Sequence, residues 1–358
     1  MQPPLFSAPP DRICVLRLSA LGDVCHVLPV VRTLQDAWPR TEITWILGAL
    51  ERKLLGHIPG IDFVVLDKKA GLAGYRDLRA RLAGRRYDAL LHMQLALRAS
   101  LASAVVPARL KLGFDRPRAR ELQWLFTNRR IEARSREHVL DSFFGFTEAL
   151  GLPGRSMRWD IPLPDSALEY ARRAIPDGAP TMIVSPCSSH QLRNWSPEGY
   201  AAVADHAVTK HGLRVLLCGG RSELELEYGA RIAGLMRQPC VNLVGKDTLL
   251  EMLATLERAT VLVSPDSGPA HMATAVGTPV VGLYATANPD RSGPYYSRRW
   301  CVDRYGDAAQ RFLGKPAARL AWTTKIERPG VMDLITTADV IERLDALMAA
   351  GAPRTPTG

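Results

Sequence analysis

Short runs of consecutive apolar residues recur along the chain and alternate with segments of helical periodicity. In the first half, the apolar runs are residues 13–18, 43–47, 63–66 and 89–92. They lack the strict alternation of a strand with one solvated face, so they predict strands that are buried on both faces. The segment after the first run has apolar residues at helical spacing, namely Val24, Val27, Leu28, Val31 and Leu34. Buried strands that alternate with helices predict a parallel sheet covered by helices on both sides.

The same alternation begins again after a proline-rich stretch near residues 153–180. We predict strands at residues 181–185, 214–217, 241–244, 261–264 and 279–284, and helices at 197–211, 223–236, 249–257 and 269–276. A last helix follows Thr336, which forms a capping-box pattern with Asp339. The sequence therefore predicts two consecutive doubly wound α/β lobes. We assign residues 1–165 to the first lobe, 166–335 to the second, and 336–358 to a C-terminal helix and tail that pack back toward the first lobe.

Length and composition fit a two-domain protein of the cytoplasm. The 358 residues suit two domains, and no apolar run reaches the ~18 residues that span a bilayer. The first residues lack the basic and apolar segments of a secretory signal. The six cysteines stand at positions 14, 25, 187, 218, 240 and 301, with no C-x-x-C pair. This spacing predicts reduced thiols rather than disulfides or a zinc site.

The positive charge of the chain is concentrated in its first half. The formal net charge is +10, and residues 1–165 contain 25 basic against 17 acidic residues, whereas the remainder contains 21 against 19. We therefore expect the first lobe to meet an anionic partner. Nucleic acid, anionic lipid and an acidic small substrate all fit the charge alone.

One segment of the second half has the pattern of a phosphate-binding turn. Asp266, Ser267 and Gly268 follow a predicted strand and open a helix that contains His271. Backbone N–H groups at a helix start, with the helix dipole, favour an anion, and a glycine lets a ligand approach the backbone closely. The alternative is that Asp266 and Ser267 only cap the helix.

Two neighbouring loops add candidates for a nucleotide site. Ser188, Ser189 and Arg193 follow the first strand of this half, and a guanidinium binds oxyanions through two hydrogen bonds. Glu223 follows a pair of glycines after the next strand and suits a ribose, although it also suits a helix N-terminus. Neither a G-x-G-x-x-G nor a P-loop pattern is present.

In the first half, Asp23 lies between the first predicted strand and the first predicted helix. A carboxylate at the edge of the sheet can act as a general base, but aspartate is also favoured as a helix cap. Residues 109–136 contain nine basic and three acidic residues, and the apolar residues 124–126 interrupt them. This pattern suits an anionic, partly apolar ligand, and it lacks a nucleic-acid-binding signature, so we do not expect nucleic acid.

These motifs together resemble glycosyltransferase family 9, the ADP-heptose:lipopolysaccharide heptosyltransferases. The resemblance covers about residues 12–348 and rests on Ser19 to Val24 with His26, Leu28 and Pro29, and on Asp266 to His271. It implies a GT-B fold, in which two Rossmann-like lobes face a central cleft, with the acceptor on the N-terminal lobe and the donor on the C-terminal lobe. It also implies inverting transfer from ADP-heptose without a metal ion or other cofactor.

The resemblance also assigns roles to single residues. Asp23 resembles the catalytic base, and Arg98 and Arg120 resemble residues that meet the acidic sugar of the acceptor. The implied donor-binding residues are Ser188, Ser189, Arg193, Glu223, Asp266, Ser267, Gly268 and His271. Arg193 stands where the family has a lysine, a departure that keeps the charge and changes the geometry.

Residues 119–129 look most like heptosyltransferase I, which implies Kdo-lipid A as the acceptor and a peripheral position on the inner face of the inner membrane. Residues 284–289 depart from the more familiar family pattern, which leaves the exact acceptor open. The alternatives are a later-acting family 9 transferase with another acceptor or nucleotide sugar, and a nucleotide-sugar epimerase on the same fold.

Overall fold

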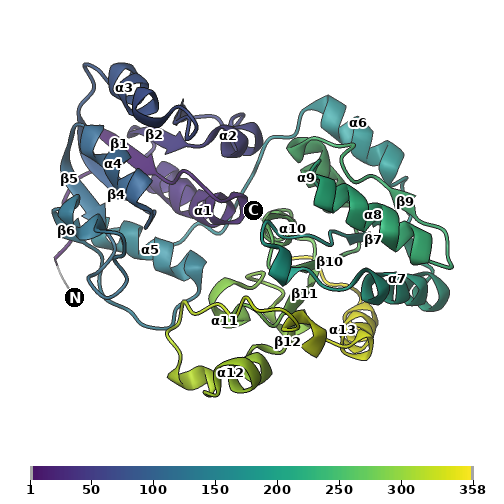
Figure 1. The fold of residues 1–358 in the computed structure, drawn as a ribbon. Helices are drawn as coiled ribbons and strands as arrows, with labels where there is room; N and C mark the ends of the chain where they lie inside the picture. Colours follow the sequence, from purple (N-terminus) through teal and green to yellow (C-terminus); the bar gives the residue numbers. More distant parts are fainter. Residues whose placement is uncertain (1–2, 356–358) are drawn as a thin grey trace. The chain divides into compact units, whose positions relative to one another are not determined.

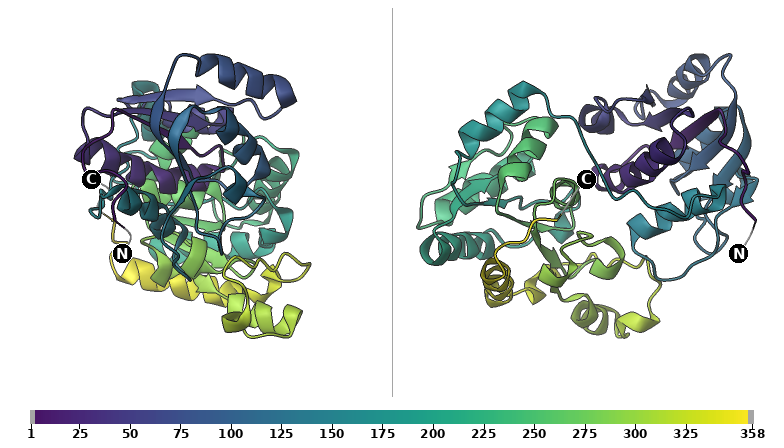
Figure 2. Two further views of the ribbon diagram at one scale, coloured as in Figure 1. Left: turned by 90° about the vertical axis from the view of Figure 1, so that its left-hand side faces the viewer. Right: turned by 180° about the vertical axis from the view of Figure 1, so that it is seen from behind.

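The computed structural model describes residues 3–355 and divides into two α/β units (Figure 1). The first unit ends at Pro162 and the second begins at Leu163, close to the boundary that we placed at residue 165. Each unit contains one six-stranded parallel sheet with helices on both faces (Figures 1 and 2). This is the doubly wound architecture that the alternation of apolar runs predicted.

The sheet of the first unit has the strand order β3-β2-β1-β4-β5-β6. Its strands are β1 (Arg12–Leu16), β2 (Glu42–Leu47), β3 (Ile61–Val65), β4 (Tyr87–His92), β5 (Ala108–Gly113) and β6 (Arg129–Arg130). Its helices are α1 (Leu21–Ala37), α2 (Ala49–Leu55), α3 (Gly71–Arg81), α4 (Leu97–Val105) and α5 (Val139–Leu150), with a 3-10 turn η1 (Gln123–Leu125). The strands β5 and β6 lie in the basic segment and were not predicted.

The sheet of the second unit has the order β12-β11-β10-β7-β8-β9. Its strands are β7 (Thr181–Val184), β8 (Arg214–Leu217), β9 (Val241–Asn242), β10 (Val261–Pro265), β11 (Val280–Tyr284) and β12 (Val302–Asp303). Its α-helices are α6 (Asp165–Ala174), α7 (Pro197–His211), α8 (Glu223–Leu235), α9 (Leu249–Arg258), α10 (Gly268–Ala275), α11 (Pro289–Ser292), α12 (Tyr305–Leu313) and α13 (Thr337–Ala349). Short 3-10 turns are η2 (Gln191–Arg193), η3 (Arg298–Trp300), η4 (Ala317–Arg319) and η5 (Met332–Leu334).

The last helix, α13, begins at the predicted capping box, in which Thr336 Oγ1 accepts from Asp339 N and Asp339 Oδ2 accepts from Thr336 N. Its buried residues Val340, Leu344 and Leu347 join the core of the second unit. The helix packs against α7 and β11 of its own unit. The expectation that it also packs back toward the first lobe stays a prediction. All six cysteines are free thiols, as predicted.

Both sheets follow the same topology, in which the chain starts at a central strand, moves to one edge and then returns to the other side. The order therefore reverses between β1 and β4 in the first unit and between β7 and β10 in the second. In such sheets, ligands bind outside the carboxyl ends of the strands at this reversal point. The loops that follow these four strands carry most of the residues that the sequence singled out.

Candidate active site

The loop after β10 is tied to the end of β7 by a chain of hydroxyl hydrogen bonds. Ser264 Oγ donates to Ser185 O at 2.9 Å and lies 2.8 Å from Ser267 Oγ. Ser267 is the residue before α10, but its side chain makes no capping hydrogen bond to that helix. The alternative raised by the sequence, in which the Ser267 hydroxyl only caps the helix, is therefore wrong for Ser267. The start of α10 at Gly268 stays available for an anion.

Asp266 lies beside two cations at the same edge of the sheet. Arg193 Nη1 is 3.4 Å from Asp266 Oδ2, and Lys325 Nζ is 3.9 Å from the same oxygen. Asp266 and His271 are buried, at 8% and 7% exposure. The structure thus brings Arg193 and the Asp266 loop together as the sequence predicted. It adds Lys325, which the sequence reasoning missed because no local pattern marks it.

A second missed residue, Glu327, holds Arg193 in place. Glu327 Oε1 accepts hydrogen bonds from Arg193 Nε at 2.8 Å and Nη2 at 2.6 Å. Burial alone would raise the pKa of Glu327, but the hydrogen bond and charge of Arg193, with the charges of His190 and Lys325, outweigh it and lower the pKa. Burial lowers the pKa of Lys325, and the charge of Asp266 opposes that shift. The cluster therefore contains two basic side chains, Arg193 and Lys325, beside two carboxyl groups, those of Asp266 and Glu327.

The loop after β7 contributes the two serines. Ser188 is buried and its backbone N–H donates to Asn194 Oδ1 at 2.7 Å, whereas Ser189 is exposed. Tyr200 Oη donates to Pro186 O at 3.3 Å and fixes the beginning of the loop. Ser188, Ser189 and Arg193 therefore lie on one loop of fixed shape, next to the end of β10.

The glycine loop after β8 is organised by a glutamate other than the predicted one. Glu225 Oε1 accepts from Gly220 N at 2.7 Å, and Ser222 Oγ donates to Glu225 Oε2 at 2.6 Å. A side chain at Gly220 would place its Cβ 2.8 Å from that carboxylate. Glu223, the first residue of α8, is exposed. Glu225 thus fixes the loop and leaves the carboxylate of Glu223 accessible to a ligand.

Asp247, after the neighbouring strand β9, was also missed by the sequence reasoning. Its Oδ2 is buried without a hydrogen-bond partner. Burial raises its pKa to about 7, and the negative charges of Glu251 and Glu225 add to the shift. A carboxyl group with a raised pKa is common in ligand-binding sites, but it also occurs in residues that serve only the fold.

In the first unit, Asp23 is the third residue of α1 and about one third of its side chain is exposed. Its Oδ2 accepts from Ala20 N at 3.2 Å and forms an ion pair with Arg17 Nη2. Arg17 is itself fixed, because its Nη1 donates to Met93 O at 2.5 Å and its guanidinium lies 5.2 Å from the ring centre of Phe143. Asp23 therefore stabilises the helix start and is also held as an accessible carboxylate.

Arg98 and Arg120 are exposed on two adjoining segments of the first unit. Arg98 is the second residue of α4, and the N–H of the preceding Leu97 donates to Glu121 Oε2 at 2.6 Å. The buried Gln123 anchors the segment that carries Arg120, since its Nε2 donates to His92 O at 2.8 Å. Sequence reasoning missed Gln123, because an isolated glutamine carries no positional signal.

Lys68 belongs to the same edge of the first sheet. Its Nζ lies 3.7 Å from Glu51 Oε2. Burial lowers the pKa of Lys68, and the charges of Arg98 and Arg17 lower it further against the opposing effect of Glu51. The positive charges of Arg17 and Arg98 thus act on Lys68, and we call these three side chains the basic cluster of the first unit; the sequence predicted only Arg98.

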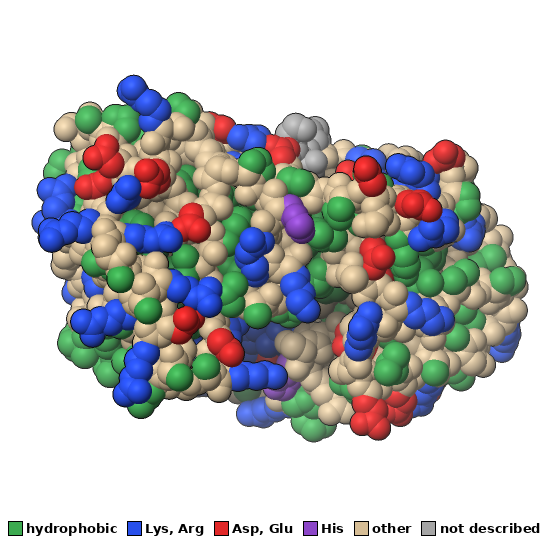
Figure 3. Space-filling model, turned by 90° about the horizontal axis from the view of Figure 1, so that it is seen from above, with side chains coloured by type: hydrophobic (Ala, Val, Ile, Leu, Met, Phe, Trp, Pro, Cys, Tyr) green, Lys and Arg blue, Asp and Glu red, His purple; other side chains and the backbone are tan. Residues whose placement is uncertain are grey.

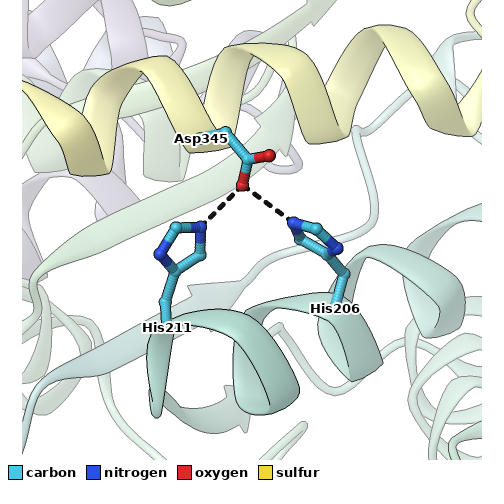
Figure 4. A group of neighbouring side chains, drawn as sticks. All are labelled: His206, His211 and Asp345. Atoms are coloured by element: carbon cyan, nitrogen blue, oxygen red, sulfur yellow. Dashed lines mark hydrogen bonds and ion pairs between the residues drawn. The ribbon is translucent and has the colours of Figure 1, made fainter.

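A group that could hold a metal ion occurs elsewhere among residues 3–355. His206 and His211 of α7 both direct Nε2 at Asp345 Oδ1 of α13, at 2.8 and 2.6 Å (Figure 4). Lys210 Nζ lies 2.8 Å from the other oxygen, Oδ2. These contacts join the two helices. They lie outside the loops described above.

Comparisons with known proteins agree with the resemblance. A model of glycosyltransferase family 9 (heptosyltransferase) matches residues 75–329. The lipopolysaccharide core heptosyltransferase OpsX of Haemophilus influenzae is 41% identical over 344 residues, which cover 96% of this chain and 99% of the relative. Lipopolysaccharide heptosyltransferase 1 of Pseudomonas aeruginosa is 26% identical over 301 residues, which cover 79% of this chain and 81% of the relative.

Solved structures show the same fold. The family 9 glycosyltransferase of Veillonella parvula has a TM-score of 0.77 at 22% identity and covers 95% of this chain and 97% of its own. The structure of the E. coli heptosyltransferase WaaC with ADP has a TM-score of 0.68 at 21% identity. The match covers 82% of this chain and 92% of the WaaC chain. The GT-B class that the resemblance implied is thereby confirmed. The family match and the similarity to OpsX show that this chain belongs to glycosyltransferase family 9, the heptosyltransferases, and that it is a glycosyltransferase.

Proposed function

We propose that the protein transfers heptose from ADP-heptose to Kdo-lipid A during synthesis of the lipopolysaccharide core. The observation that carries the proposal is the convergence of Arg193, Lys325 and the start of α10 at the reversal point of the second sheet. These groups suit a nucleoside diphosphate, because two cations and a helix N-terminus all favour phosphate oxygens. The lipopolysaccharide core heptosyltransferase OpsX supports the sugar and the pathway.

Glu327 supports the assignment of Arg193 to the diphosphate. Its carboxylate accepts two hydrogen bonds from the Arg193 guanidinium, and a phosphate can accept the same pair. We propose that the diphosphate takes over contacts of Arg193 and Lys325 when the donor binds. In this site Ser188, Ser189, Gly268 and His271 surround the phosphates and the sugar, and Glu223 binds the ribose.

The proposed reaction is a single displacement with inversion. Asp23 accepts the proton of an acceptor hydroxyl while that oxygen forms a bond to the anomeric carbon of heptose. The bond from that carbon to the diphosphate oxygen breaks, and ADP leaves with the electron pair. Arg193, Lys325 and the N–H groups at Gly268 stabilise the negative charge that develops on the leaving group. We propose that these groups suffice, without a metal ion or other cofactor.

The acceptor side of the proposal rests on the basic cluster of the first unit. Arg98, Arg120 and Lys68 carry positive charge at the edge of the sheet that also holds Asp23. Kdo carboxylates and lipid A phosphates are anionic, so they complement this edge. No helix among residues 3–355 is long and apolar enough to cross a membrane. On the charge of this basic edge we propose salt-sensitive peripheral attachment to the inner face of the inner membrane, and equal recovery in the soluble fraction at low and high salt would contradict it.

The direct test is turnover with purified substrates. We expect heptose transfer from ADP-heptose to Kdo-lipid A. Transfer only to an already heptosylated acceptor would overturn the acceptor assignment, and free epimerised sugar without acceptor would overturn the reaction class.

Asp23→Ala is expected to lower kcat by about 10²–10⁴-fold, the usual contribution of a general base. The matched control is Asp141→Ala, because Asp141 is the third residue of α5 as Asp23 is of α1. If both variants fold and lose activity equally, Asp23 is not the base.

A further inference from the structure

Exposed leucines are concentrated in the first unit. Among residues 3–355, nine large apolar side chains are exposed, and six of these belong to the first unit. We call these six the leucine rim: Leu50, Leu72, Leu97, Leu101, Leu122 and Leu125. Leu72 and Leu125 are the most exposed, at 76% and 60%. Single exposed leucines are ordinary, but a group of this kind indicates an interaction surface.

The leucine rim follows the carboxyl edge of one sheet. Leu50, Leu72 and Leu97 are within the first two residues of α2, α3 and α4, which follow β2, β3 and β4. Leu101 lies one turn further along α4, on the face of Leu97, and Leu122 and Leu125 lie in the connection from β5 to β6. Because parallel strands end at the same edge, these elements all begin at that edge of the sheet, and α3 packs against α4.

Hydrogen bonds hold three of the four elements of the rim together. Glu121, beside Leu122, accepts from the N–H of Leu97 at 2.6 Å. Tyr75 of α3 donates its hydroxyl to Arg98 O of α4 at 3.2 Å. The leucines are therefore presented by a fixed framework and do not depend on one flexible loop.

Basic side chains accompany the leucines on the same elements. Lys69, Arg98, Arg116 and Arg120 are exposed next to the rim, and the guanidinium of Arg116 lies 3.9 Å from the ring centre of Trp124. On the face that Figure 3 shows, basic and apolar side chains of this unit are likewise interspersed. The nearby carboxylates of Asp67 and Glu121 accept backbone N–H groups, from Lys69 and Leu97.

We propose that the leucine rim inserts into the headgroup region of an anionic lipid bilayer, while Lys69 and Arg116 bind lipid phosphates and Arg98 and Arg120 stay with the acceptor. This inference rests on the proposed function and names the surface by which the enzyme reaches a lipid-linked acceptor. Leucines that are spread over four elements and interspersed with basic side chains match an interface in which apolar groups are buried and cations remain at the phosphates. A protein partner would instead require a continuous apolar core within the surface.

The test is vesicle binding of the full chain without any sugar acceptor. The variant is Leu72→Ser/Leu125→Ser, because these two side chains are the most exposed and contribute least to packing. The matched control is Leu226→Ser/Leu235→Ser, at two exposed leucines of α8 in the second unit. Vesicles contain either phosphatidylcholine alone or phosphatidylcholine with about one third phosphatidylglycerol.

We expect the wild-type protein to co-float with the anionic vesicles, and the rim variant to bind them at least about tenfold more weakly, since each leucine loses apolar burial. The control variant should bind as the wild type does. Equal binding by the rim variant, or an equal loss in the control variant, would overturn the proposal. Salt should weaken wild-type binding, because it screens the basic side chains, without abolishing it. Complete removal by 0.5 M salt would therefore overturn the insertion of the leucines.

A soluble, deacylated acceptor separates this inference from the proposed function. With that acceptor, the rim variant should turn over at the wild-type rate, which also shows that it is folded. If the wild-type protein binds vesicles through the rim but transfers no heptose, the proposed function is wrong, whereas the proposal that the leucine rim binds the membrane is supported. If the wild-type protein transfers heptose but the rim variant binds vesicles as the wild type does, only the proposal about the leucine rim is wrong.

Discussion

Lys325→Met tests whether the second cation beside Asp266 belongs to the donor site. The substitution removes the charge and keeps an unbranched side chain of similar length. Lys325 Nζ lies 3.9 Å from Asp266 Oδ2, and its side chain is 34% exposed. A hydrogen bond to a charged group contributes about 1.5–3 kcal/mol, and this exposure favours the lower end because solvent screens the charge. At about 1.4 kcal/mol for each factor of ten, ADP should bind roughly 10–30-fold more weakly.

The assay is isothermal titration calorimetry with ADP and with adenosine. Adenosine lacks the diphosphate, so Lys325→Met should leave its affinity unchanged. Lys315→Met is the control, because Lys315 is an exposed lysine of the same unit. The reasoning is refuted if the variant binds ADP within threefold of the wild type, or if adenosine binding falls as much as ADP binding.

Two further predictions concern pH and stability. Burial raises the pKa of Asp247 to about 7, so ionisation of Asp247 destabilises the fold increasingly as the pH rises above about 4, and fully above about 7. In urea unfolding, Asp247→Asn should therefore stabilise the protein by about 2 kcal/mol more at pH 8.5 than at pH 5.5. An equal effect at both pH values would contradict this. Burial opposes ionisation of Asp345, but hydrogen bonds from Lys210, His206 and His211 outweigh it and lower its pKa. Asp345→Asn should lower Tm at pH 7, and the difference in Tm from the wild type should shrink as the pH falls below about 4. A difference in Tm that stays constant down to pH 2 would show that ionisation of Asp345 is not its cause.

The sequence was sufficient for the architecture because buried parallel strands carry a local signal. Strand β8 and helix α7 have the predicted bounds, and most other predicted elements differ by one or two residues at either end. The strands β5, β6 and β12 were missed because they contain charged residues, such as Arg109 and Lys111 in β5, that hide the apolar pattern. β6 and β12 are edge strands, which tolerate such residues because solvent reaches their side chains; β5 lies next to the edge strand β6.

The candidate site was only partly predictable, for a different reason. Asp266 directly follows β10 and Arg193 lies in the loop after β7, and β7 and β10 are neighbours in the sheet, so the topology brings the two loops together. Glu327 contacts Arg193 across 134 positions of sequence, and its segment has neither strand nor helix periodicity. Local spacing carries no information about such a contact. Arg17 and Lys68 were missed similarly, because their roles depend on charges that the fold assembles.

The contact of Arg193 with Glu327 has a consequence for synthesis of the chain. Translation proceeds from the N-terminus, so the loops with Ser188, Arg193 and Asp266 emerge from the ribosome before Lys325 and Glu327. A nascent chain that ends after α12 has both loops but lacks one cation of the cluster and the carboxylate that holds Arg193. Chains truncated before residue 325 should therefore be retained more weakly on immobilised ADP than the full chain, even where the second sheet has already folded.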